Sequence, residues 1–423
     1  MSTITKPTLT STTLWTSTAV AIKLIIGLVV IKIFALNFGS AGLGQAANYM
    51  TLLTVFGVLS GAGILNAVTK FVAEYEQDPQ RLQAILGASS LLIILVSVML
   101  AVIGLMFTQP ISLFLFQTAD YSLTIQILAL LQCLIALGNY FIAILKGQRQ
   151  AKACAMSSIF ANLVGALWLL FCLWIWGYQG ALIGFACIPA LILVPSLIAL
   201  LKQNWHWQWL KPNFDLSASH ILRHYMIMTL VAVCIIPTVY ILLRNQLIES
   251  QGLSAVGLWQ GLSRISDAYL QLLTTAFSVY LLPTFAKLSD KSAIQKEVKK
   301  ALGFIFPLAL GLALLVFFSR DYLIIVLFSP DFTPMSDLFG WQLVGDLFKV
   351  ASYVFGYLWL AKAATGRYIC AEIVQGMLLF GLSSYGIAQQ GVAGATLGYG
   401  LCYMTYFGFC WVLFKLDYGS KKR

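Results

Sequence analysis

The chain has 423 residues, of which 60% are hydrophobic and only 10% are charged, with a formal net charge of +11 and a mean hydropathy of +0.87. A soluble globular protein is about half apolar and about a quarter charged, so this composition excludes an ordinary soluble protein. The apolar residues fall in runs of about 20, the length that spans ~30 Å of hydrocarbon. We therefore expect a polytopic α-helical membrane protein.

Apolar runs of this length recur along the whole chain and predict twelve membrane-spanning helices. The first run contains Lys23 and has no small-residue cleavage site, so we interpret it as a retained helix and not as a signal peptide. The connectors are too short to fold as a soluble domain. In chain order the expected spans are 14–36, 46–68, 85–107, 122–145, 153–175, 180–201, 224–243, 257–283, 301–318, 338–361, 369–387 and 392–414.

Basic residues outside the expected spans are distributed unevenly. Nearly all of them lie in the two termini and in one alternating set of connectors, whereas the opposite set carries only Arg244 and Arg320. The positive-inside rule therefore predicts that both termini are cytoplasmic. On this interpretation the net positive charge is a topology signal, and we expect no nucleic-acid partner.

Short sequence matches at a near-constant offset indicate an internal duplication. AGLGQ at 41–45 corresponds to VGLWQ at 256–260, and Lys146 after the fourth span corresponds to Lys362 after the tenth. Six spans per repeat is an even number, so both halves enter the membrane from the same side and the repeat is parallel. We predict an all-α integral membrane fold of two six-helix lobes around a central cavity. Its parts are an N-terminal lobe at 1–201, a cytoplasmic connector at 202–223 and a C-terminal lobe with a short basic tail at 224–423.

Ionisable residues inside the expected spans are the strongest functional signal. Each would cost about 2.5–3.5 kcal/mol at a lipid-facing bilayer centre, so most of them must face a bundle interior or a water-filled cavity. This pattern indicates a protein that moves something polar through the membrane. The residues are Lys23, Lys32, Arg264, Asp267, Asp346, Lys349 and Glu372.

Four of these residues form two pairs at helical spacing. Arg264 and Asp267 are three residues apart, and Asp346 and Lys349 repeat the arrangement with the signs reversed, so each pair shares a helix face. Two interpretations stay open for each pair. Either the partners neutralise each other within the helix, or they line a cavity and are partly released to a substrate.

The remaining three are single charges in their spans. Lys23 has no acidic residue in its own helix, so its partner must be another helix, water or an anionic ligand, and we favour a functional role. Lys32 is nine residues further on, which places it on the opposite face of a straight helix, and we interpret it as structural. Glu372 lies near a span end, where a gate, a proton site or a partly solvated interface residue is possible.

Four cations and three anions in the membrane interior favour an anionic cargo such as a diphosphate. We expect Lys23, Arg264 and Lys349 to bind it, and Asp267, Asp346 and Glu372 to act as charge partners or in ion coupling.

No GxxxxGK[ST] loop is present, so energy should come from an ion gradient, the membrane potential or the cargo's own gradient. The cysteines form no CxxC pair and the histidines have no zinc spacing, so we expect no cofactor or metal.

Several strings in the chain resemble the Wzx-type flippases of the multidrug/oligosaccharidyl-lipid/polysaccharide exporter superfamily. Within that family the resemblance is strongest to the flippases of enterobacterial common antigen biosynthesis, and it runs from the first span to the last. The strings are GAGILNAVTKFVAEY at 61–75, GLWQGLSRISDAYLQ at 257–271, FSVYLLPTF at 277–285 and WQLVGDLFKVASYVFGYL at 341–358.

The resemblance implies a bacterial inner-membrane transporter, not an enzyme. It would translocate an undecaprenyl-diphosphate-linked oligosaccharide from the cytoplasmic to the periplasmic leaflet by alternating access. Arg264, Asp267, Asp346 and Lys349 fall within the matching strings, whereas Lys23 rests on the residue-level argument alone. Besides the bilayer and the cargo, possible partners are the polymerase and the chain-length regulator of the same pathway.

Three other functions compete with this one. An ion-coupled antiporter of drugs or other small molecules from the same superfamily predicts an acidic, not a basic, cavity. A non-transporting scaffold of the polysaccharide assembly machinery predicts that neutralising the intramembrane charges leaves function intact. A membrane transferase is disfavoured because no long outer connector carries paired carboxylates.

Overall fold

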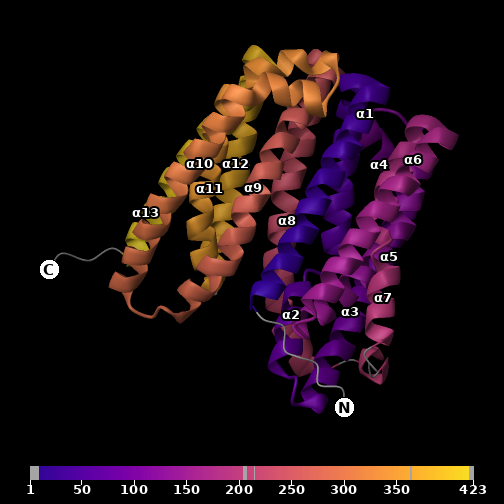
Figure 1. The fold of residues 1–423 in the computed structure, drawn as a ribbon, viewed down its shortest axis with the longest axis vertical. Coiled ribbons are helices and arrows are strands. Elements are labelled where there is room, and N and C mark those ends of the chain that lie inside the picture. The colour runs from indigo at the N-terminus through magenta and orange to yellow at the C-terminus, as the bar shows by residue number, and fades with distance from the viewer. Residues whose placement is uncertain (1–8, 203–206, 214, 363, 419–423) are drawn as a thin grey trace. The chain divides into compact units, whose positions relative to one another are not determined.

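The computed structural model describes residues 9–202, 207–213, 215–362 and 364–418, and the regular structure in these ranges is helical (Figure 1). The all-α prediction is therefore confirmed. A helix satisfies its backbone hydrogen bonds internally, which is the condition that a lipid environment imposes on long apolar segments. Caps mark some helix starts: the Asp290 carboxylate accepts a hydrogen bond from the backbone N–H of Ala293 at 3.0 Å, at the start of α10 (Lys291–Leu327).

The helices follow one another with short breaks. In the first half they are α1 (Leu9–Leu59), α2 (Leu65–Glu74), α3 (Pro79–Met106), α4 (Thr108–Phe116), α5 (Ser122–Gly147), α6 (Ala151–Ala190), α7 (Leu193–Leu201) and the 3₁₀ helix η1 (Trp207–Leu210). In the second half they are α8 (Leu216–Gln251), α9 (Leu253–Lys287), α10, the 3₁₀ helix η2 (Pro330–Leu338), α11 (Phe339–Ala361), α12 (Thr365–Gln390) and α13 (Val392–Tyr418).

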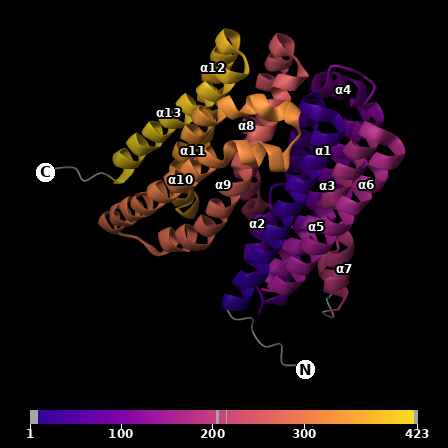
Figure 2. The same ribbon diagram turned by 45° about the horizontal axis from the view of Figure 1, so that its top comes forward.

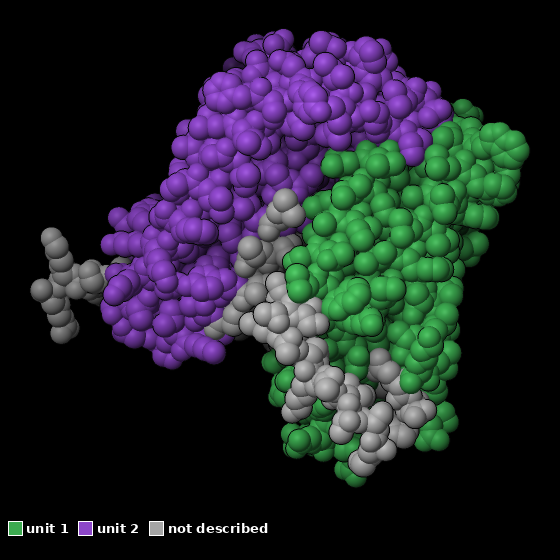
Figure 3. Space-filling model, in the orientation of Figure 1, with its two compact units in different colours: residues 1–30, 49–233 green, residues 31–48, 234–423 purple. Residues whose placement is uncertain are grey.

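The chain groups into two compact units, coloured separately in Figure 3. Unit 1 is Met1–Val30 with Tyr49–Val233, and unit 2 is Ile31–Asn48 with Cys234–Arg423. The assignment of the middle of α1 to unit 2 was not predicted from the sequence. The lobe boundaries at 201 and 224 stay a prediction, and residues 203–206 and 214 of the predicted connector lie outside the described residues.

Close backbone contacts explain why the middle of α1 belongs to unit 2. A Cβ at Gly44 would lie 2.0 Å from the carbonyl oxygen of Leu253, and one at Gly257 would lie 1.8 Å from that of Ser40. Only glycine allows the backbones of α1 and α9 to approach so closely, as small residues do in membrane helix pairs.

Unit 1 is built around α5, which packs against α2, α3, α6 and α7 (Figure 2). Gly147 sits against Val72, where a Cβ would come within 2.5 Å. Buried hydroxyls tie the helices together: Tyr140 donates to the carbonyl of Leu86 at 2.9 Å and is 3.1 Å from the hydroxyl of Ser90. Such bonds matter because an unpaired polar group inside an apolar core is costly.

Unit 2 is built around α11, which contacts α9, α10, α12 and α13. Its core is rich in large rings, among them the fully buried Trp359, Phe355 and Tyr399. Helices α12 and α13 form a tight hairpin, visible as adjacent yellow ribbons in Figure 2. A Cβ at Gly386 would lie only 2.1 Å from the carbonyl oxygen of Gly394.

Four turn glycines with positive φ repeat at the offset of the proposed duplication. Gly39 (φ 62°, ψ −165°) within α1 corresponds to Gly252 (φ 82°, ψ 179°) between α8 and α9. Gly177 (φ 56°, ψ −133°) within α6 corresponds to Gly391 (φ 59°, ψ −132°) between α12 and α13. These backbone conformations are accessible essentially to glycine alone. The matching turns support the internal duplication inferred from the sequence.

Within the described residues, nine helices are long and apolar enough to cross a membrane. Two of these segments, Leu14–Leu59 and Ala151–Leu201, have 46 and 51 residues, about twice the length that one span needs. Each bends at its turn glycine, so each supplies two arms. The chain is a multi-pass membrane protein, while the count of twelve spans and the orientation of the termini stay predictions.

Candidate functional site

A buried carboxylate on α11 is the centre of the candidate site in unit 2. The side chain of Asp346 is only 1% exposed. Tyr269 on α9 donates its hydroxyl to Oδ2 at 2.6 Å, and Tyr399 on α13 donates to Oδ1 at 2.7 Å. The amide of Gln342, one turn earlier on α11, lies 3.5 Å from Oδ1 and 3.3 Å from the hydroxyl of Ser266 on α9. Three helices thus converge on one carboxylate, which accepts every bond, as an ionised carboxylate does.

We call Asp346, Tyr269, Tyr399 and Gln342 the tyrosine–aspartate cluster. It depends on a glycine: a Cβ at Gly345 would lie 2.3 Å from Cδ1 of Tyr399. The ring can therefore reach the carboxylate only because residue 345 has no side chain.

Lys349 lies one turn after Asp346 on the same helix and is half-buried. Its ammonium group lies 5.6 Å from the ring centroid of Tyr399 and 5.4 Å from that of Tyr403. Cation–π contacts of this kind are worth about 2 kcal/mol or more where water is excluded. In the described structure, Asp346 and Lys349 do not form a direct ion pair. Lys349 therefore contacts tyrosine rings directly and interacts with Asp346 only at longer range.

Arg264 and Asp267 of α9 are less enclosed than Asp346. The guanidinium of Arg264 is half-buried and interacts electrostatically with Asp267, whose side chain is exposed. Both residues share a helix with Tyr269 of the tyrosine–aspartate cluster. Unit 2 therefore carries cationic groups, phenols and carboxylates on neighbouring helices.

Arg244 is a residue that the sequence interpretation misplaced. The apolar run at 224–243 suggested that Arg244 lies in an outer connector, but α8 continues to Gln251 and the side chain is only 6% exposed. Its Nη1 donates to the carbonyl of Ala47 at 3.2 Å, and its guanidinium lies 5.4 Å from the ring centroid of Tyr240. The sequence signal that could have placed Arg244 correctly is Gly252. A turn glycine at this position indicates that the preceding helix continues past Arg244 and ends just before residue 252.

In the part of the chain that the structure describes, no hydrogen bond or ion pair joins Glu372, Lys32 or Lys23 to the tyrosine–aspartate cluster. Glu372 is half-buried on α12, next to Tyr368. Lys32 belongs to unit 2 and donates to the carbonyl of Val326 at the end of α10. Lys23 belongs to unit 1, is exposed, and interacts electrostatically with Lys146 of α5.

The arrangement can hold an anion and respond to a cation. Lys349 and Arg264 supply positive charge and hydrogen-bond donors of the kind that phosphates require. The Asp346 carboxylate has its donors in place, so loading it with a proton or a cation would rearrange bonds to two other helices.

Comparison with known proteins finds two relatives that share one name. The chain is 42% identical over 409 residues to a protein named lipid III flippase from Escherichia coli (strain K12), covering 96% of this chain and 98% of that protein. The protein of the same name from Shigella flexneri matches equally well.

Solved structures of low identity share the fold. An inward-facing multidrug transporter superposes with a TM-score of 0.72 at 10% identity, covering 93% of this chain and 94% of that one. The lipid II flippase MurJ in an inward closed conformation superposes with a TM-score of 0.69 at 16% identity, covering 95% and 87%. The family model described as polysaccharide biosynthesis protein matches residues 9–289. From this match and the full-length relatives, we conclude that the chain belongs to the polysaccharide biosynthesis protein family.

Proposed function

We propose that this protein is a flippase for an undecaprenyl-diphosphate-linked oligosaccharide, the lipid III precursor of enterobacterial common antigen. It acts in the bacterial inner membrane and moves the cargo from the cytoplasmic to the periplasmic leaflet. The observation that carries the proposal is the 42% identity over 96% of the chain to two proteins named lipid III flippase. The protein is a transporter and not an enzyme.

The charged residues support an anionic headgroup as cargo. We infer that Lys349 and Arg264 of unit 2 and Lys23 of unit 1 contact the diphosphate in the course of alternating access between the two lobes. Lys349 is suited to this role because its ammonium group lies close to two tyrosine rings and forms no direct ion pair with Asp346.

We further infer that Asp346 couples the cycle to a proton or another cation. Its two phenol donors come from α9 and α13, so a change in its charge would alter how three helices are held. Asp267 and Glu372 are charge partners in the same unit. The polymerase and chain-length regulator of the pathway would receive the translocated cargo as functional partners.

Drug efflux is the second candidate. Multidrug transporters superpose at 10–11% identity, a level at which the likeness concerns the fold alone. The cationic character of the site also argues against a drug cation as cargo. A non-transporting scaffold is third, because a buried and fully hydrogen-bonded carboxylate is an expensive feature for a protein that moves nothing.

The decisive experiment is deletion of the gene in its host and complementation with single variants. We expect deletion to reduce outer-leaflet glycan and to accumulate the lipid-linked precursor, and the wild type to reverse both. Lys349→Ala, Arg264→Ala and Lys23→Ala should each reduce glycan at least tenfold while the protein still inserts. Lys415→Ala, an equal loss of charge at the end of α13, is the matched control. Normal glycan with all three variants would refute the cationic site, and no precursor accumulation on deletion would favour efflux.

A further inference from the structure

The α6 hairpin of unit 1 is closed tightly along half of its length. After the turn at Gly177, its two arms run antiparallel, and Gly180, Gly184 and Gly165 lie in their interface. A Cβ at these glycines would lie, respectively, 2.0 Å from the carbonyl oxygen of Cys172, 2.6 Å from Cα of Leu169 and 2.9 Å from Cα of Ile188. The backbones are in contact over this stretch, which leaves no room for another molecule.

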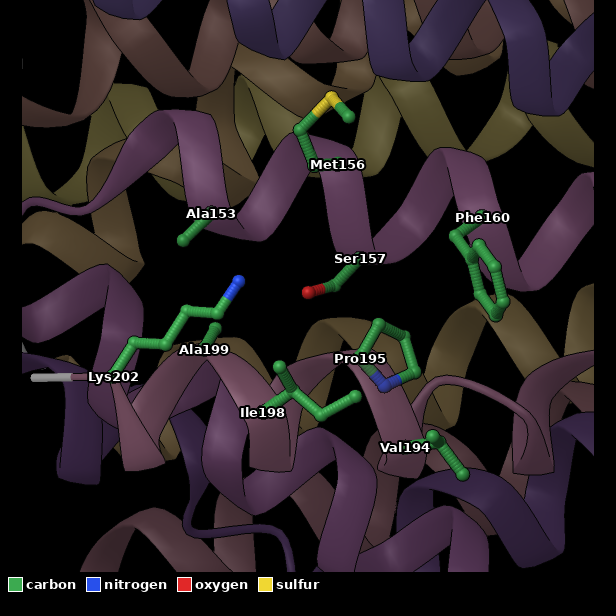
Figure 4. Close-up of a pocket in the computed structure, with 9 residues that line it drawn as sticks. All are labelled: Ala153, Met156, Ser157, Phe160, Val194, Pro195, Ile198, Ala199 and Lys202. Carbon is green, nitrogen blue, oxygen red and sulfur yellow. The ribbon is translucent and has the colours of Figure 1, made fainter.

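Beyond Ile188 the hairpin opens. The second arm is interrupted where α6 ends at Ala190, and α7 begins at Leu193 with Pro195 in its first turn. A groove of about 450 Å³ lies between the first arm and α7 (Figure 4). Met156 and Phe160 form one wall, and Val194 and Ile198 form the other. These four apolar side chains are 45–52% exposed, as lipid-facing residues are.

One end of this α6–α7 groove is polar. Lys202, the residue that follows α7, extends its amine into the groove, and the hydroxyl of Ser157 lies in the wall between Met156 and Phe160 (Figure 4). The remaining lining is apolar. A ligand that matches it has a hydrocarbon chain with a negative charge at one end.

The length of the groove selects among such ligands. Val194 and Lys202 are eight residues apart, about 12 Å along a helix. Half of the hydrocarbon thickness of a bilayer is about 15 Å. On the predicted orientation Lys202 lies at the cytoplasmic surface, so the groove runs from the headgroup level through most of one leaflet. This length fits an acyl chain, which stays within one leaflet, better than a long polyprenyl chain.

We propose that the α6–α7 groove is a binding site for an anionic glycerophospholipid of the cytoplasmic leaflet. One acyl chain lies against Phe160 and Val194, and the phosphate contacts the amine of Lys202. The site belongs entirely to unit 1 and does not depend on the identity of the transported cargo. It would hold a structural lipid at the open end of the hairpin, where the glycine contacts cease.

The test measures lipid binding to the purified, delipidated full-length protein by native mass spectrometry. Phosphatidylglycerol and phosphatidylethanolamine with identical chains are compared for four proteins: wild type, Lys202→Gln, Ala153→Phe and Lys415→Gln. We expect the wild type to prefer phosphatidylglycerol and Lys202→Gln to weaken its binding about fivefold, abolishing the preference. Ala153→Phe fills the groove and should remove the tightest site for both lipids. Lys415→Gln should behave as the wild type.

Three results would overturn the proposal. One is equal affinity of the wild type for the two lipids. Another is unchanged phosphatidylglycerol binding by both variants, Lys202→Gln and Ala153→Phe, provided that the Ala153→Phe protein keeps the wild-type melting temperature. The third is displacement of phosphatidylglycerol by an equimolar amount of undecaprenyl phosphate, which would assign the groove to the cargo. Because Lys202 is exposed, its substitution tests the site even if Ala153→Phe fails to fold.

Discussion

The hairpin of α6 in unit 1 and the hairpin of α12 and α13 in unit 2 are built in the same way and end differently. Both turn at a glycine of nearly identical backbone conformation, Gly177 and Gly391, and both are closed by glycines that bring backbones into contact. The unit 1 hairpin opens beyond Ile188 into an apolar groove. In the unit 2 hairpin, α13 carries tyrosines that reach the carboxylate of Asp346 and the amine of Lys349.

The comparison separates what the duplicated fold requires from what each copy has added. Glycine turns and glycine contacts occur in both copies, so they belong to the architecture. Among the residues that the structure describes, only α13 of these two hairpins contacts a buried carboxylate and a lysine amine through tyrosines. A functional interpretation should therefore rest on the residues by which the copies differ.

The largest expected effect tests the shared architecture. Gly386→Val and Gly180→Val place side-chain atoms against a carbonyl oxygen in unit 2 and unit 1, respectively. Overpacking costs about 1–3 kcal/mol and more where backbone blocks the way, so we expect both variants to lose most of the folded protein. Size-exclusion chromatography after heating measures the folded fraction. Gly408→Val, where a Cβ meets nothing within 4 Å, is the control. If only one of the two substitutions reduced the folded fraction, the glycine contacts would not be a requirement that both copies share.

The second effect tests what unit 2 has added. Asp346→Ala removes the acceptor of the Tyr269 and Tyr399 hydroxyls and leaves the buried Tyr399 donor unsatisfied. We expect a loss of about 2–3 kcal/mol in the free energy of unfolding, with a smaller loss for Asp346→Asn, which keeps one acceptor oxygen. Melting curves of the purified variants distinguish the two. Equal stability of the Ala variant and the wild type would show that the cluster does not tie α13 to α9 and α11.

The smallest effect lies in unit 1 and sharpens the contrast. Ser90→Ala removes one hydroxyl contact with Tyr140, which keeps its bond to the carbonyl of Leu86. We expect a cost of about 1 kcal/mol or less and normal glycan assembly in the complementation assay. A cost as large as that of Asp346→Ala would mean that unit 1 depends on its polar contacts as strongly as unit 2 does.

Much of the fold could be predicted from the sequence because composition and periodicity determine it. Long apolar runs predicted helices, and repeated short strings predicted a duplication that the turn glycines support. Gly39 and Gly177 lie between expected spans, so the sequence predicted breaks near both, but not that a positive-φ glycine makes each turn, because a glycine is also tolerated inside a straight helix. The grouping of 31–48 with unit 2 depends on backbone contacts with α9, which lie far away in the sequence.

The site could be predicted only in part. The spacing of Asp346 and Lys349 placed them on one helix face, and the structure agrees. Their partners could not be found this way: Tyr269 and Tyr399 come from other helices, 77 and 53 residues away from Asp346. Local spacing suggested an ion pair because it considers only neighbours within a helix. A single sequence does not say which tyrosine of a distant helix arrives at a given carboxylate.

Gly345 shows how a residue with no functional group can control a polar site. Any larger residue there would push the ring of Tyr399 away and would leave the Asp346 carboxylate with fewer donors. On the proposed role of Asp346, loss of transport would follow from a substitution that touches neither the cargo nor an ion. In a saturation screen this glycine would score like a ligand-binding residue although it has no side chain.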